Sequence, residues 1–130
     1  ETKGLSFQGL WLDAANPSPD QGWAQHERRG LCARAGADAL LALALVHHIA
    51  IGRNVPLARA VDWLVGLAPA GIIEFVPRAD PMVQRLLAHR ADIFQDFTEE
   101  NFLNAVSARA RIVRSEAMSG GRRLVWYDRG

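Results

Sequence analysis

An uninterrupted apolar run, Ala39–Val46, ends directly in two histidines, His47 and His48. A short run without polar residues is typical of an element buried on both sides, such as a central strand of a parallel sheet. Ligands of open α/β sheets bind just outside the carboxyl ends of the strands. The two histidines are therefore expected at a position where such sheets bind ligands. Alanine and leucine favour helix over strand, so the run alone does not decide between a helix and a strand. Its shortness and the strand–helix–strand pattern that follows favour a strand over Asp38–Val46.

The rest of the chain alternates strand-like and helix-like segments, with proline and glycine at most boundaries. This pattern predicts strands over Ser6–Asp13, Asp38–Val46, Ile72–Val76, Arg111–Glu116 and Arg122–Asp128. It predicts helices over Asp20–Ala35, Leu57–Ala68, Pro81–Arg90 and Glu99–Ala108. Alternating strands and helices indicate an α/β fold with a mostly parallel sheet, and the last two strands are expected to form an antiparallel hairpin at its edge.

The composition is that of an ordinary globular chain. The 130 residues suit one domain over 1–130, with 49% hydrophobic and 22% charged residues. A net charge of +1 disfavours nucleic acid and anionic membranes as partners, and the apolar run is far shorter than the roughly 20 residues of a membrane span. The single cysteine, Cys32, fits a reducing compartment, so we expect a cytoplasmic protein. Because residue 1 is Glu rather than Met, we also expect a piece of a longer protein.

Four stretches together resemble the C-terminal part of class I S-adenosylmethionine-dependent methyltransferases, in particular a bacterial nodulation-related group. They are Leu12–Pro19 with Gly22-Trp23 and Glu27-Arg28, then Ala37–Ile51, then Ile73–Pro77 with Asp80–Leu87, and finally Asp92–Phe94. The resemblance covers nearly the whole chain. It implies a partial Rossmann-like sheet from a fold with strand order 3-2-1-4-5-7-6, S-adenosylmethionine as cofactor, and a small molecule or another acceptor of the methyl group.

The chain departs from this family at the cofactor loop. The family holds its cofactor with a glycine-rich turn after the first strand, where backbone N–H groups approach the ligand closely, but this chain has no G-x-G motif. The resemblance therefore implies that the chain begins near the third strand, that it is inactive alone, and that it associates with a missing N-terminal half. An alternative is a non-catalytic interaction module, because a half-sheet exposes apolar surface and a free edge through which it can form a homodimer.

Cofactor contacts are implied for residues after the first predicted strand. By the resemblance, Asp13 contacts the adenine amine, and Ala14 and Asn16 line the cofactor pocket. From the residues alone, Asp13 serves equally well to begin the Asn-Pro turn that follows. The stretch Asn16–Pro19 is similar to the Asn-Pro-Pro-aromatic loop of amino-methyltransferases, but it follows the third strand rather than the fourth, which leaves a rigid pocket loop or a plain turn.

Three residues are candidates for catalysis: His47, His48 and Glu74. A histidine titrates near neutral pH and can act as general base toward the methyl acceptor; the alternative is a structural histidine. If the strand continues through both histidines, only one of them faces the cleft. No metal site is expected, since adjacent histidines without a third ligand make no zinc signature.

Charged residues elsewhere have more ordinary interpretations. Glu74 interrupts an apolar run, and a buried carboxylate is costly unless it is paired. We therefore expect it to face the cleft or to find a partner such as Arg78 or a histidine. The pair Arg122-Arg123 is too sparse to indicate nucleic-acid binding and is interpreted as part of a solvated face.

Overall fold

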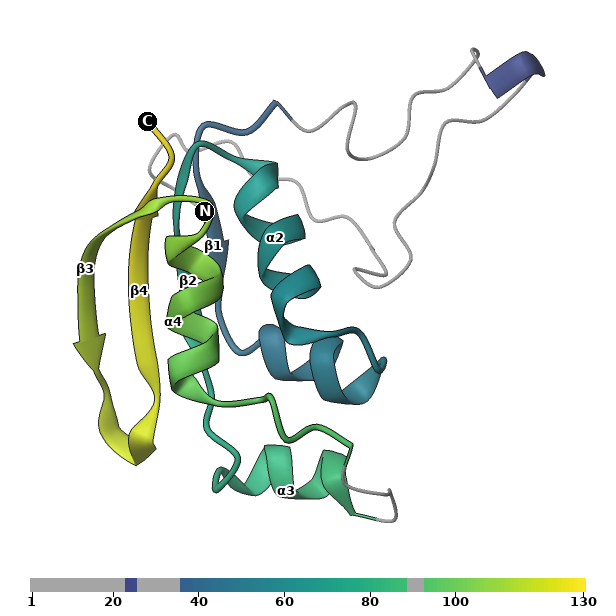
Figure 1. Ribbon diagram of the computed structural model, residues 1–130, viewed down its shortest axis with the longest axis vertical. Coiled ribbons are helices and arrows are strands. Elements are labelled where there is room, and N and C mark those ends of the chain that lie inside the picture. Colours follow the sequence, from purple (N-terminus) through teal and green to yellow (C-terminus); the bar gives the residue numbers. More distant parts are fainter. Residues whose placement is uncertain (1–22, 26–35, 89–92) are drawn as a thin grey trace, which may run out of the picture.

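The computed structural model describes residues 23–25, 36–88 and 93–130, which form a four-stranded mixed sheet with helices against it (Figure 1). The strands are β1 Leu40–Ala42, β2 Ala70–Phe75, β3 Arg111–Ala117 and β4 Arg123–Asp128. The helical segments are η1 Trp23–Gln25, the π-helical η2 His48–Gly52, α2 Leu57–Leu67, α3 Pro81–Leu87, α4 Glu99–Ser107 and η3 Ser119–Gly121. The predicted strand Ser6–Asp13, and all but three residues of the predicted helix Asp20–Ala35, lie outside the described residues.

The strand order in the sheet is β1-β2-β4-β3. Only β1 and β2 are parallel, whereas β4 runs antiparallel to both β2 and β3. The expectation of mostly parallel strands was therefore wrong for the described sheet. The predicted hairpin is confirmed, and Gly120 and Gly121 form its turn with positive φ angles of 77° and 79°. Its second strand, β4, lies inside the sheet beside β2 rather than at the edge.

The apolar run forms a much shorter strand than Asp38–Val46. Pairing stops at Ala42, and Ala44 adopts a left-handed φ of 52° that breaks the extended backbone. The chain then enters a helical turn at Val46 and continues as η2. The run is also not buried throughout, since Leu41 is 66% exposed and Leu43 is 52% exposed. Only three residues of the run therefore pair as a strand, and helix begins at its last residue, Val46.

Helices α2 and α4 lie side by side on one face of the sheet (Figure 1). Both are amphipathic and end within one residue of their predicted C-terminal ends. Thr98 caps α4 by accepting a hydrogen bond from the N–H of Asn101 at 3.1 Å. Between helices and sheet, the Phe75 ring lies 5.1 Å from that of Phe97 and 5.2 Å from that of Phe102, measured between centroids. This aromatic group fixes β2 against α4.

The opposite face of the sheet carries an open-face stripe of three apolar side chains: Leu41, Ile72 and Trp126. They are paired in register across β1, β2 and β4 and are 66%, 36% and 46% exposed. Beside the stripe is a hollow of about 240 Å³, lined by Ile72, Arg114, Glu116, Leu124 and Trp126. Parallel strand pairs are ordinarily covered on both faces, so this stripe is a surface available for a further segment or molecule.

Candidate functional site

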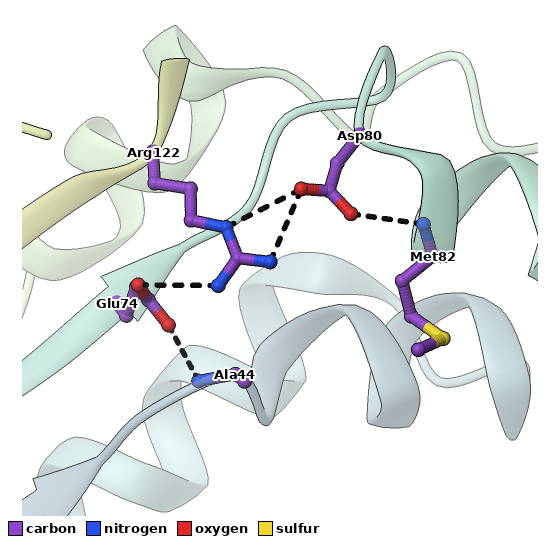
Figure 2. A network of polar contacts seen from close by, with 5 residues as sticks. All are labelled: Ala44, Glu74, Asp80, Met82 and Arg122. Carbon is purple, nitrogen blue, oxygen red and sulfur yellow. Dashed lines mark hydrogen bonds and ion pairs between the residues drawn. The ribbon is translucent and has the colours of Figure 1, made fainter. Parts of the chain in front are cut away.

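Charged side chains gather at the carboxyl ends of β1 and β2, where the β3–β4 turn also ends (Figure 2). Glu74 comes from β2, Asp80 directly precedes α3, and Arg122 directly precedes β4. We call these three residues the arginine cluster. Arg122 is 42 residues from Asp80 along the chain, and the sheet order brings it to both carboxylates because β4 pairs with β2. The cluster therefore joins three separate segments at the edge of the sheet where α/β proteins bind ligands.

The guanidinium of Arg122 bridges the two carboxylates. Its Nε and Nη2 donate to Oδ2 of Asp80 at 3.3 Å and 3.1 Å, and its Nη1 lies 3.7 Å from Oε2 of Glu74. The side chain of Arg122 is 35% exposed, while those of Glu74 and Asp80 are only 12% and 10% exposed. This partial burial distinguishes the cluster from an ordinary surface ion pair.

Asp80 also caps helix α3. Its Oδ1 accepts a hydrogen bond from the N–H of Met82 at 2.9 Å, and Pro81 occupies the first helical position, as the sequence predicted. The Met82 N–H, with a further contribution from Arg122, holds the pKa of the Asp80 carboxyl below its ordinary value of 3.8. The carboxylate is thus fixed in its charged form between a helix start and a guanidinium.

Glu74 holds the end of β1. Its Oε1 accepts a hydrogen bond from the N–H of Ala44 at 2.8 Å, while Oε2 faces Arg122 (Figure 2). The expectation that this carboxylate needs a partner is confirmed, but the suggested partner Arg78 was wrong. The guanidinium of Arg78 instead donates to the carbonyl of Phe94.

His47 and His48 lie in a helical turn after β1 rather than on the strand. Alternation along a strand therefore does not decide which of them is accessible. His47 is only 1% exposed, whereas His48 is exposed, and their ring centroids are 4.3 Å apart. His48 is thus the histidine of this pair that is accessible from solvent.

Buried His47 is held in its neutral form. Burial lowers its pKa to about 4, and the nearby side chains of His48 and Arg122 act in the same direction. The carboxylates of Asp80 and Glu74 oppose this effect without reversing it. The Nδ1 atom of His47 has no hydrogen-bond partner within the described part of the chain. A buried imidazole of this kind suits packing behind a site better than proton transfer at neutral pH.

The segment from Ala44 to Asn54 has an unusual backbone. Both ends are left-handed non-glycine residues, with φ of 52° and 60°, and the π-helical η2 lies between them. Such conformations are uncommon and concentrate at functional sites. This segment begins where β1 ends and carries both histidines, so its geometry supports a candidate functional site at this edge of the sheet.

Comparison with known proteins gives one informative match. The chain is similar to nodulation protein NoeA of Rhizobium meliloti (strain 1021). The two are 52% identical over 121 residues, which is 93% of this chain but 25% of NoeA. The chain thus spans about a quarter of the length of this relative. No protein-family model matches the chain, and no solved structure matches it.

The similarity to NoeA supports the nodulation-related group that the sequence motifs indicated. The name of NoeA states no reaction, so methyl transfer stays a prediction. Among the described residues, no helix combines the length and apolar character that crossing a membrane requires. Within the same residues, no three His, Cys, Asp or Glu side chains come together in a way that could hold a metal ion.

The predicted site residues fall into two groups. His47, His48 and Glu74 come together at one edge of the sheet, whereas Asp13, Ala14 and Asn16 lie outside the described residues. Sequence reasoning missed Arg122, which is not part of a solvated face. The signal was available, because a carboxylate inside an apolar strand requires a cation. In the register of β2 and β4, Arg122 lies two residues before the partner of Glu74, on the same face of the sheet.

Proposed function

We propose that this chain is the C-terminal part of an S-adenosylmethionine-dependent methyltransferase domain. The observation that carries the proposal is the sheet order. In a fold ordered 3-2-1-4-5-7-6, the last four strands along the chain occupy the order 4-5-7-6, and β1-β2-β4-β3 is the same order. The insertion of the second hairpin strand beside β2 is the distinctive part of this match, since a simple meander would place β3 there.

The position of the polar residues also supports the proposal. In this fold the edge formed by the carboxyl ends of β1 and β2 is where cofactor and acceptor meet. S-adenosylmethionine would supply an activated methyl group, and Asp13, Ala14 and Asn16 would hold it together with a glycine-rich loop elsewhere in the full-length protein. Exposed His48 would accept the proton that the acceptor's nucleophile loses. The acceptor is a small molecule or another nucleophile, and we propose that the reaction takes place in the cytoplasm.

Calorimetry and labelled-methyl transfer with the full-length protein test the proposal. The full-length protein should bind S-adenosylmethionine, whereas residues 1–130 alone should bind it weakly or not at all. In a screen of acceptor classes, His48→Gln should lower methyl transfer about a hundredfold, the lower range for loss of a general base, and leave cofactor binding unchanged. Arg59→Gln, on the exposed side of α2, is the matched control and should retain full transfer.

Two results would contradict the proposal. One is a full-length protein that does not bind the cofactor, and the other is micromolar cofactor binding by residues 1–130 alone. Neither depends on the identity of the acceptor, so the cofactor assignment can be rejected before any substrate is known.

The open-face stripe supports a second candidate function, a non-catalytic interaction module in which this face meets a second copy of the chain. The hollow beside the stripe carries one cation, Arg114, and one anion, Glu116, so the same surface on a second copy offers both signs of charge. The edge of the sheet formed by β3 is protected against pairing with another strand, because β3 carries a bulge between Ile112 and Arg114. Association is therefore expected at the stripe rather than at β3.

Sedimentation velocity tests this second function. The chain should sediment as a dimer at micromolar concentration, and Trp126→Lys should convert it to a monomer because a charge would then face the partner's apolar stripe. Met118→Lys is the control, since Met118 is similarly exposed at 44% but lies in the hairpin turn. A monomeric chain at all concentrations, or an equal effect of both variants, would exclude this function.

A further inference from the structure

We infer that Glu74 is a positioning residue: its carboxylate holds Ala44 in the left-handed conformation and so fixes the turn that carries His47 and His48. The inference refines the sequence-based hypothesis that Glu74 itself takes part in catalysis. It rests on the proposed function only in placing the two histidines at a site. The contact that carries it is the 2.8 Å hydrogen bond from the N–H of Ala44 to Oε1 of Glu74.

The conformation of Ala44 needs a specific cause. A left-handed backbone is unfavourable for an L-residue with a Cβ, because the Cβ then lies too close to the following carbonyl oxygen. Ala44 is exposed, so burial of its methyl group does not offset this cost. A hydrogen bond to a charged carboxylate is among the stronger contacts a backbone N–H can make. Glu74 therefore supplies the interaction that selects this conformation.

The backbone conformation of Ala44 determines how the helical turn with the two histidines begins. The next residue, Leu45, accepts hydrogen bonds through its carbonyl from the N–H of His48 at 3.0 Å and from the N–H of Ile49 at 3.2 Å. The helical turn therefore begins at the residue that follows the one Glu74 holds. A change in the Ala44 backbone would reorient this carbonyl and, with it, both imidazole rings.

Both carboxylate oxygens of Glu74 are already engaged. Oε1 binds Ala44, Oε2 faces Arg122, and Arg122 is in turn held by Asp80 (Figure 2). A carboxylate that is 12% exposed and occupied on both oxygens is poorly placed to take a proton from a substrate. The same contacts make it a rigid support, because they tie it to the hairpin and to the start of α3.

Two conservative variants separate the effect of the length of the Glu74 side chain from the effect of its charge. Glu74→Asp keeps the charge, but its side chain is one methylene shorter and loses the Ala44 N–H. Glu74→Gln removes the charge, but its amide oxygen can still accept that hydrogen bond. We expect Glu74→Asp to shift the imidazole resonances of His47 and His48 in NMR spectra and to accelerate hydrogen exchange of the Ala44 amide at least tenfold. Glu74→Gln should leave both close to wild type.

A rescue variant and a control complete the experiment. Ala44→Gly in the Glu74→Asp background should return the histidine resonances toward wild type, because glycine adopts positive φ without steric cost. Glu116→Asp shortens an exposed carboxylate on β3 and should change neither readout. The inference is overturned if Glu74→Asp leaves the histidines unchanged, or if Glu74→Gln shifts them as much. No cofactor is involved, so failure here is distinct from failure of the methyltransferase proposal.

Discussion

Lowering the pH from above 6.5 to about 4 should reduce the free energy of unfolding by about 3 kcal/mol through His47 alone. In the folded chain the pKa of His47 is about 4, whereas its ordinary value is 6.5, and each pKa unit corresponds to about 1.4 kcal/mol. Between these two values the unfolded chain binds a proton that the folded chain does not. Stability is therefore complete above 6.5 and is lost as the pH falls toward 4.

Urea unfolding of the wild type and of His47→Leu across this pH range isolates the effect. The leucine variant should lose most of the pH dependence, since it fills a similar volume and has no group to protonate. His48→Gln is the matched control and should retain most of the dependence, because burial of His47 is the largest cause of its lowered pKa. Asp80 acts in a separate, more acidic pH range. Because its pKa is lowered in the folded chain, its contribution to stability is present above pH 3.8 and is lost as the pH falls below that value.

Parallel pH profiles for the wild type and His47→Leu would contradict this expectation. They would mean that His47 takes up a proton in the folded chain as readily as in the unfolded one. The ring of His47 would then not be buried by the packing of the turn after β1.

Segments with strong local signals could be predicted from the sequence. Proline and glycine bracket α2, and the Asp80-Pro81 and Thr98 caps mark the starts of α3 and α4. The Gly120-Gly121 turn likewise marks the hairpin. In each case the residue that sets the boundary has a conformational or hydrogen-bonding preference of its own. The boundary therefore does not depend on distant contacts.

The apolar run lacks such a boundary residue, and there the prediction was least accurate. A run of alanine and leucine has no periodicity that separates strand from helix, and the residue that breaks the strand is an alanine with positive φ. No sequence rule predicts that conformation. The Ala44 N–H is bound by Glu74, which is 30 residues further along the chain and lies next to Ala44 because β1 and β2 pair.

The site shows the same division between local and distant causes. The need of Glu74 for a partner follows from its place in an apolar strand, and Asp80 follows from its cap. Whether Arg122 contacts both carboxylates depends on which strand lies beside β2. The sequence suggested the hairpin at an edge, so the arginine before its second strand had no assigned neighbour. Only the insertion of β4 next to β2 brings Arg122 to both carboxylates.

Arg122→Ala should lower the free energy of unfolding by about 2 kcal/mol, between the values for an exposed ion pair and for a fully buried one. The variant leaves the Glu74 carboxylate, which is 12% exposed, without its cation, and it also disconnects the hairpin from the start of α3. Arg122→Lys should recover part of the loss. An ammonium is a point charge and cannot reproduce the three guanidinium contacts with two separate carboxylates.

Arg111→Ala is the matched control for this experiment. Arg111 also forms an ion pair from a strand of the hairpin, 3.8 Å from Asp128, but its side chain is 70% exposed. Pairs of that kind contribute roughly 0–1 kcal/mol, so urea unfolding should show a clear difference between the two variants. In the Arg122→Ala background, Glu74→Gln should restore part of the stability, because it removes one of the two carboxylate charges that lose their cation.

Equal effects of Arg122→Ala and Arg111→Ala would show that the arginine cluster is only a surface ion pair. Recovery by Glu74→Gln would show the opposite, since a neutral side chain can repair the variant only if a partly buried charge caused the loss. In that case Arg122 is the cation that compensates the partly buried Glu74 carboxylate, and Glu74 holds the chain where β1 ends. The stability of the cluster and the position of the two histidines then share one physical cause.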